Sequence, residues 1–239
     1  MERLGAREEH ILDFMIRDYV RNAVPISSGR ICRAGGFRLS PATVRNVMLE
    51  LDERGFLEQP HTSSGRMPTD QAYRYFVDHL MALRAPAKKE REVLDGLVKE
   101  VKTRHELFFE DFAKILSREL GLFTGIASFK EHFKMEGFGL EQVFSEPEFY
   151  DRNLTVEFSH LIDNLEEVAR DFLDRSSETR PASFIGGENS PEAKEFGAVT
   201  MKFSDNEFGT CIVFSLGPKR MNYEKATSFI NFVVKDLIR

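Results

Sequence analysis

The chain has 239 residues, of which 41% are hydrophobic and 30% are charged, and its formal net charge is −6 at pH 7. This length predicts two domains, each of which can bury a core of its own. The sequence contains neither a run of about eighteen apolar residues nor an apolar N-terminal segment, so we expect no membrane span and no secretion signal. Cys32 and Cys211 lack the spacing of a metal or redox motif, and we expect no structural disulfide between them. Two free cysteines fit a protein of the reducing cytoplasm.

Two helices are predicted at the start of the chain. Apolar residues at helical spacing predict the first of them over residues 7–21. Ser27 can cap a second, short helix, because its hydroxyl group can accept a hydrogen bond from a free backbone N–H of the first turn. The pair Gly35-Gly36 is expected to end this second helix.

A third helix is predicted between Ser40 and Gly55. Ser40 is a good N-cap, Pro41 suits the first helical position, and Gly55 can adopt the left-handed turn that ends a helix. An apolar stripe that starts at Val44 marks the buried side. The opposite side carries Ala42, Thr43, Arg45, Asn46 and Glu50. An ordinary solvated helix can show this pattern, but these side chains also suit a DNA major groove, where Arg binds guanine and Asn binds adenine.

A polar loop follows the third helix and an extended segment at residues 56–60. The loop contains the candidate wing residues His61, Thr62, Ser63, Ser64 and Arg66. Hydroxyl, backbone N–H and guanidinium groups can bind phosphate oxygens, and Gly65 permits a close approach. An ordinary hairpin tip would have a similar composition. Three helices followed by a hairpin is the order of a winged helix-turn-helix domain, whose third helix enters the groove.

Positive charge is concentrated in the same region. Residues 17–45 contain six arginines and one acid, Asp18, which gives a local net charge of +5. Residues 141–180 contain eleven acids and four basic residues, which gives a local net charge of −7. The overall negative charge therefore argues against binding of nucleic acid by charge alone, but a local basic surface remains available.

The remainder of the chain predicts a helix-rich α+β domain with a small antiparallel sheet. Pro86 marks a linker, and residues 88–120 predict one long helix with apolar residues at heptad spacing. His105 interrupts this apolar seam, which fits either pairing with another subunit or packing within its own domain. We expect a further helix over residues 155–173 and a last helix over residues 223–238. Strand spacing occurs at residues 182–185, 199–203 and 210–216.

Several long motifs resemble the bacterial heat-inducible transcription repressor family HrcA. In the N-terminal part they are SPATVRN at residues 40–46, QPHTSSGRMPTD at 59–70 and YRYFVD at 73–78. In the C-terminal part they are FIGGEN at residues 184–189 and LGPKRMNY at 216–223, with the short motif PEF at 147–149. The resemblance therefore includes both ends of the chain.

The resemblance implies two domains. Residues 1–83 would form a winged helix-turn-helix DNA-binding domain, and residues 84–239 a linking helix with a reduced GAF-like domain for regulation and dimerisation. Family members are usually longer and carry an inserted dimerising segment. Here residues 120–125 lead almost directly to the region of residues 138–149, so the inserted segment is expected to be absent.

The function implied by the resemblance is repression of chaperone genes. A homodimer would bind double-stranded DNA at the inverted-repeat operator CIRCE, and the chaperonin GroEL would maintain the active fold. The contacts would come from Ser40, Ala42, Thr43, Arg45, Asn46, His61, Thr62, Ser63, Ser64 and Arg66. Two other functions are also consistent with the sequence. One is a winged-helix regulator that responds to a small ligand, and the other is an interaction module that has lost dimerisation and operator binding.

An enzyme is the least favoured class. The six histidines are scattered and form no metal-binding pair, and the sequence has no phosphate-binding loop of the Gly-Lys-Ser/Thr type. Lys219-Arg220 could bind an anion, but we expect a surface turn there. We therefore predict no catalytic residue, no cofactor and no metal.

Overall fold

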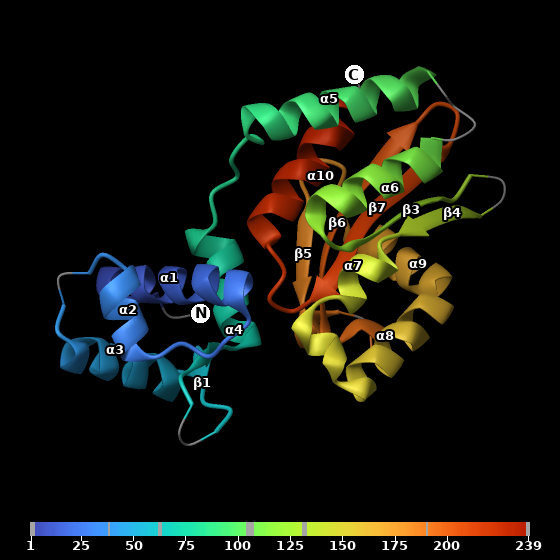
Figure 1. Ribbon diagram of the computed structural model, residues 1–239. Coiled ribbons are helices and arrows are strands. Elements are labelled where there is room, and N and C mark those ends of the chain that lie inside the picture. The colour runs from blue at the N-terminus through green and yellow to red at the C-terminus, as the bar shows by residue number, and fades with distance from the viewer. Residues whose placement is uncertain are drawn as a thin grey trace. The chain divides into compact units, whose positions relative to one another are not determined.

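The computed structural model describes residues 3–37, 39–61, 64–103, 108–130, 133–189 and 191–237. These residues form two compact units, Met1–Met81 and Ala82–Arg239 (Figure 1). Among the described helices, none is both long and apolar enough to cross a membrane. Both units contain helices and antiparallel strands, which confirms the predicted α+β class.

The N-terminal unit begins with three helices, followed by a short antiparallel strand pair and a helical end. The helices are α1 (Ala6–Asn22), α2 (Ser28–Ala34) and α3 (Pro41–Glu53). The strands are β1 (Leu57–Glu58) and β2 (Met67–Pro68), and the unit ends with α4 (Asp70–Tyr75) and the π-helical turn η1 (Phe76–Leu80). In the register, Leu57 lies opposite Pro68 and Glu58 opposite Met67.

The predicted caps form as local hydrogen bonds. The Ser27 hydroxyl accepts from the backbone N–H of Arg30 at 3.3 Å, and the Ser40 hydroxyl accepts from that of Thr43 at 3.1 Å. Gly55 follows α3 with a φ of 78°, in the left-handed region that favours glycine. The ends of α2 and α3 are therefore fixed by residues that are close in sequence.

The core of the N-terminal unit joins the first and last helices through apolar packing and one buried hydrogen-bond chain. Ile11 and Leu12 of α1 and Val44 of α3 are fully buried. The hydroxyl group of buried Tyr75 accepts from the backbone N–H of Leu4 at 3.0 Å and donates to a carboxylate oxygen of Glu9 at 2.7 Å. Burial raises the pKa of Tyr75, and its hydrogen bond to Glu9 adds to this effect. These hydrogen bonds connect the start of α1 to α4.

The C-terminal unit is built on a five-stranded antiparallel sheet in the order β4-β3-β7-β6-β5. Its strands are β3 (Phe123–Ser128), β4 (Lys134–Phe138), β5 (Ala182–Ile185), β6 (Phe196–Asp205) and β7 (Gly209–Pro218). Long strands β6 and β7 form the predicted hairpin. Strands β3 and β4 were not predicted, so the sheet is larger than expected.

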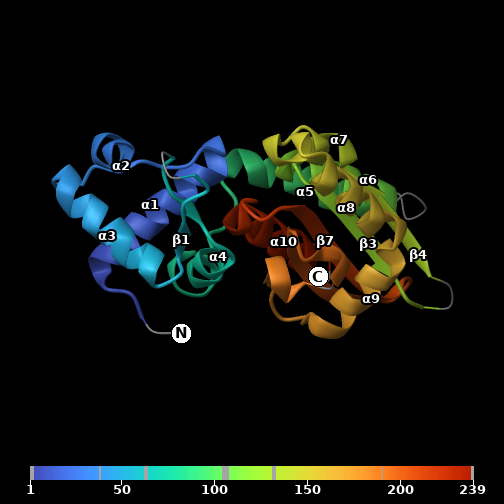
Figure 2. The same ribbon diagram turned by 90° about the horizontal axis from the view of Figure 1, so that it is seen from below.

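Helices cover both faces of this sheet (Figures 1 and 2). On one face, α6 (Phe108–Leu120) contacts β3 and β4, α10 (Tyr223–Leu237) contacts β5 and β6, and α5 (Lys88–Thr103) packs on both helices. The other face carries α7 (Leu140–Phe144), α8 (Arg152–Asp163) and α9 (Leu165–Arg175). Short 3-10 turns are η3 (Pro147–Tyr150), η4 (Gly186–Glu188) and η5 (Pro191–Ala193).

The prediction of one long helix over residues 88–120 is wrong. This segment forms two helices, α5 and α6, which pack against each other. Leu94 and Phe112, which belong to the predicted seam, are completely buried within this unit. Packing within the domain therefore accounts for these seam residues, whereas His105 lies outside the described residues.

The prediction of one helix over residues 155–173 is also wrong. The chain forms α8 and α9, which are separated at Asn164. The side-chain amide of Asn164 donates to the carbonyl oxygen of His160 at 2.8 Å. Because Asn readily satisfies backbone groups at a helix end, it stops α8 where apolar spacing alone would continue the helix.

Candidate nucleic-acid interface

Ser40 and Thr43 organise the start of α3. Besides capping the helix, the Ser40 hydroxyl lies 2.9 Å from the Thr43 hydroxyl, at hydrogen-bond distance. Ser40 is exposed and Thr43 is half-buried. The two hydroxyl groups therefore stabilise the first turn, and the remaining free backbone N–H groups of this turn point toward the N-terminal end of the helix, where anions bind favourably.

Ala42, Arg45 and Asn46 lie on the exposed side of α3. Val44 and Met48 lie on the other side of the helix and are at most 2% exposed. In the described part of the chain, neither the Arg45 nor the Asn46 side chain forms a hydrogen bond or ion pair with another residue. Their side chains are therefore accessible to an external partner.

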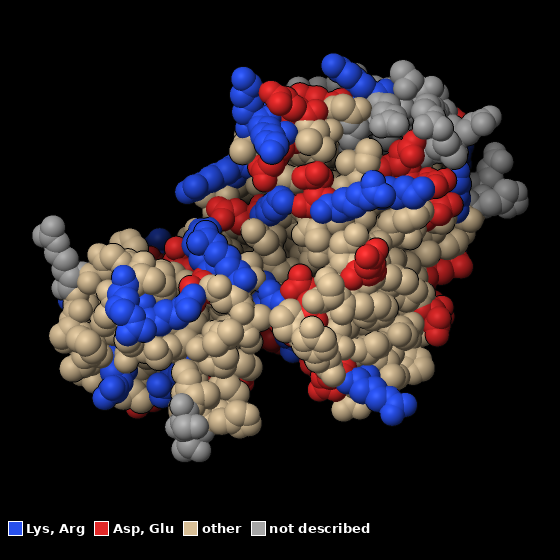
Figure 3. All heavy atoms as spheres, viewed as in Figure 1, with Lys and Arg blue, Asp and Glu red and all other residues tan. Residues whose placement is uncertain are grey.

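The arginines of residues 17–45 are partly neutralised by nearby carboxylates. Arg30 forms two hydrogen bonds with Asp18, at 2.6 and 2.8 Å, and these raise the pKa of Arg30. Arg17 pairs with Asp13 at 2.9 Å, and Asp13 lies just outside the counted segment. Figure 3 shows arginine side chains over the part of the unit formed by α1, α2 and α3, which contains no lysine. This surface is basic, but less so than the count suggests.

The candidate wing lies between β1 and β2. Thr62 and Ser63 lie outside the described residues. His61 is exposed, and the Ser64 hydroxyl donates to the carbonyl oxygen of His61 at 2.6 Å and accepts from its backbone N–H at 3.0 Å. Gln59 donates to the carbonyl oxygen of Ser64 at 2.9 Å. Ser64 therefore closes the loop, while His61 remains accessible to solvent.

Arg66 joins the base of this loop to α3. Its side chain is only 15% exposed, and its Nε donates to the carboxylate of Asp52 at 2.7 Å. The backbone of Arg66 exchanges hydrogen bonds with that of Ile26, at 2.8 and 2.9 Å. The adjacent Gly65 lies directly against the Ile26 backbone, where an added Cβ would be 2.5 Å from its carbonyl group. We name Ile26, Asp52, Gly65 and Arg66 the wing junction.

The sequence did not reveal the wing junction. Glycine and arginine at the loop suggested contacts with phosphate, yet both residues make internal contacts here. Asp52 lies one residue after the buried Leu51, and its spacing from Arg66 gives no local signal of an ion pair. The structure therefore brings Arg66 close to α3, although it leaves this guanidinium less accessible than that of Arg45.

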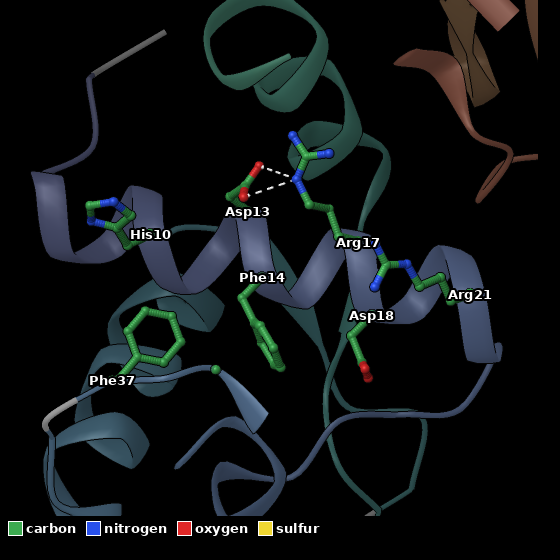
Figure 4. Close-up of a pocket in the computed structure, with 8 residues that line it drawn as sticks. His10, Asp13, Phe14, Arg17, Asp18, Arg21 and Phe37 are labelled. Carbon is green, nitrogen blue, oxygen red and sulfur yellow. Dashed lines mark hydrogen bonds and ion pairs between the residues drawn. The ribbon is translucent and has the colours of Figure 1, made fainter. Parts of the chain in front are cut away.

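A cleft of about 270 Å³ lies beside α1 in the same unit (Figure 4). Phe14 and Phe37 lie on one side of α1, with ring centroids 5.8 Å apart, whereas Asp13 and Arg17 lie on its other side. The cleft is lined by His10, Asp13, Phe14, Arg17, Asp18, Arg21, Gly35 and Phe37. Because acids and bases alternate along it, the cleft presents no strong field of a single sign.

In the C-terminal unit, Arg220 connects two of the sequence motifs. Its guanidinium donates to Glu148 of the PEF motif, with one distance of 2.9 Å, and also to Glu146. Burial lowers the pKa of Arg220, but hydrogen bonds and charge from Glu148 and Glu146 outweigh this and raise its pKa overall. The expectation of a surface turn is wrong for Arg220, which is 7% exposed.

A family model described as "HrcA protein C terminal domain" matches residues 43–227 of the chain. The heat-inducible transcription repressor HrcA of Desulforudis audaxviator is 37% identical over 126 residues, which cover 53% of this chain and 35% of that protein. The HrcA repressor of Geobacter sulfurreducens is 50% identical over 92 residues, which cover 38% of this chain and 27% of that protein. The matched stretch thus spans about a third or less of these curated relatives.

A solved structure shows the same fold. The crystal structure of a hypothetical protein aligns with a TM-score of 0.79 and covers 98% of each chain, at 16% sequence identity. At this identity the similarity concerns the fold alone.

Proposed function

The chain belongs to the HrcA family, and on this premise we propose that it is a sequence-specific DNA-binding repressor of heat-shock genes. The N-terminal unit would be a winged helix-turn-helix domain, with α3 in the major groove and the β1–β2 loop as its wing. The order of the elements supports this assignment, since three helices precede an antiparallel strand pair. The observation that carries the proposal is the exposed pair Arg45 and Asn46 on the capped α3.

The chemistry of α3 fits the edges of bases. Arg45 can donate two hydrogen bonds to guanine, Asn46 can bind adenine, and Ala42 can contact a thymine methyl group. Ser40 and the N-terminal end of α3 can bind a phosphate. Thr43 is left with its methyl group for such contacts, because its hydroxyl already bonds Ser40.

A dimer would read an inverted repeat. One helix reads few bases, whereas two half-sites related by a two-fold axis roughly add their binding free energies. We propose that the operator is the inverted repeat CIRCE of chaperone-gene promoters and that the protein works in the cytoplasm as a homodimer. The C-terminal unit would be the GAF-like domain that provides regulation and dimerisation.

Control by the chaperonin GroEL would follow from limited stability. A loss of roughly 1–2 kcal/mol can change the active fraction of a marginally stable protein several-fold. When damaged proteins occupy the chaperonin after heat shock, the fraction of folded repressor would fall and chaperone genes would be expressed.

The proposed function is tested by a footprint on promoter DNA. We expect the full chain to protect both half-sites of the inverted repeat upstream of chaperone genes, at concentrations that leave a scrambled repeat unprotected. Equal protection of the scrambled repeat, or no protection of either DNA, would contradict the proposal. Sedimentation at the same concentrations measures whether the bound species is a dimer.

Arg45→Ala is expected to weaken binding to the repeat by about 2 kcal/mol per half-site, because one bidentate base contact is worth roughly 1–3 kcal/mol. Binding to random DNA should change little. The matched control is Arg21→Ala, which removes another exposed arginine of the same unit. Fluorescence anisotropy with both DNAs measures the difference, and equal losses on the two DNAs for Arg45→Ala would reduce Arg45 to a phosphate contact.

Arg66→Ala is expected to weaken binding without changing its salt dependence. A side chain that neutralises one phosphate contributes about one to the slope of log K against log salt. Arg66 is held by Asp52 instead, so its loss should act by loosening the wing junction. Asp52→Asn should then weaken binding in the same way. A slope that falls by about one in Arg66→Ala alone would identify a phosphate contact.

A further inference from the structure

Leu49 is an apolar residue on the side of α3 that also carries Arg45 and Asn46. Its exposed fraction is 42%, whereas the other large apolar side chains of the helix are buried. Those buried residues are Val44, Val47, Met48 and Leu51, with exposed fractions of 5% or less. These four residues form the buried side of α3, and Leu49 is not part of it.

The position of Leu49 relates it to the proposed base-reading residues. It follows Arg45 by four residues and Asn46 by three, and residues at these spacings are neighbours on one face of a helix. Exposed Glu50 and Glu53 follow it toward the end of α3. Because carboxylates repel phosphates, this part of α3 is not a phosphate-binding surface.

We propose that Leu49 contacts the C5-methyl group of a thymine and thereby contributes to operator specificity. This inference rests on the proposed function. The thymine methyl is the apolar group that a base pair presents in the major groove, and it distinguishes T from C. An apolar side chain beside an arginine and an amide matches a site where a thymine neighbours the bases that those two groups bind.

The test combines substitutions of Leu49 with removal of single methyl groups from the DNA. Duplexes of the inverted repeat are prepared in which each symmetric pair of thymines is replaced in turn by deoxyuridine, which lacks only the methyl group. Binding of the wild type, Leu49→Ala and Leu49→Met is measured on every duplex. The matched control is Leu83→Ala, which truncates another exposed leucine outside α3. Thermal unfolding checks that each variant remains folded.

We expect one symmetric pair of deoxyuridines to weaken wild-type binding about fourfold per half-site, the effect of one buried methyl group. Leu49→Ala should bind the unmodified repeat more weakly and lose its sensitivity at that same position. Leu49→Met should keep most of this sensitivity, since its side chain remains apolar and long. Leu83→Ala should show the full wild-type sensitivity.

The outcomes separate the two proposals. If the wild type binds the repeat but Leu49→Ala stays as sensitive as wild type to every deoxyuridine, the contact with thymine is disproved and the repressor function stands. If Leu49→Ala changes sedimentation and leaves the DNA coupling intact, Leu49 belongs to a protein contact and the inference is likewise disproved. If the wild type binds no repeat DNA, the proposed function itself fails.

Discussion

Replacing Arg220 with methionine is expected to lower the free energy of unfolding of the C-terminal unit by about 3 kcal/mol. The Arg220 side chain is 8% exposed and pairs with both Glu146 and Glu148. Methionine fills similar space but leaves these two carboxylates close together without a counter-charge. Because they are 33% and 25% exposed, water can partly solvate them, which keeps the expected loss below the upper limit for breaking a buried ion pair.

Urea unfolding of the full chain measures this loss. The matched control is Lys219→Met, which breaks the more exposed pair of Lys219 with Glu195 at 3.3 Å and should cost at most about 1 kcal/mol. Adding Glu146→Gln and Glu148→Gln to Arg220→Met should recover most of the stability, because the neutral amides need no counter-charge. A loss in Arg220→Met no larger than that in Lys219→Met would show that the buried pairing contributes little.

Gly65→Ala is expected to destabilise the N-terminal unit by about 3 kcal/mol and to weaken operator binding strongly. The added methyl group would lie 2.5 Å from the carbonyl carbon and oxygen of Ile26. These are main-chain atoms, so they cannot rotate away as a side chain can. The backbone would have to move to relieve the clash. This movement would break the hydrogen bonds between Ile26 and Arg66 and displace the loop from α3.

Gly29→Ala is the control for this substitution. An added methyl group at Gly29 would meet Arg33 at an ordinary 3.4 Å, and alanine favours a helix over glycine by up to about 1 kcal/mol. Its stability should therefore be unchanged or slightly raised. Calorimetry measures the stability of the two variants, and a DNA-binding assay measures their affinity for the operator. Normal stability and affinity in Gly65→Ala would show that the wing junction yields without cost.

Local signals in the sequence were sufficient to predict α3. Ser40 caps the helix three residues before the N–H that it binds, and Gly55 follows its end, so all of the required information lies within one short segment. The same segment places Arg45 and Asn46 opposite the apolar stripe. The candidate reading surface was therefore predictable from helical spacing alone.

Contacts between distant segments could not be predicted in this way. Arg220 and Glu148 are 72 residues apart in the sequence, and neither residue type signals a buried partner. The apolar spacing on the two sides of the α5–α6 junction is continuous, so it carries no sign that two helices pack against each other. Likewise, the strand order places β3 between β4 and β7, which depends on tertiary packing.

The two outer strands of the five-stranded sheet bear on aggregation. An outer strand exposes unpaired N–H and C=O groups that can template pairing with another chain. Strand β4 carries the charged residues Lys134 and Glu136, and β5, at the opposite end, has only 4 residues. Charge at one end and brevity at the other are both known ways to discourage edge-to-edge growth, so the sheet can remain open at its sides without promoting fibre formation.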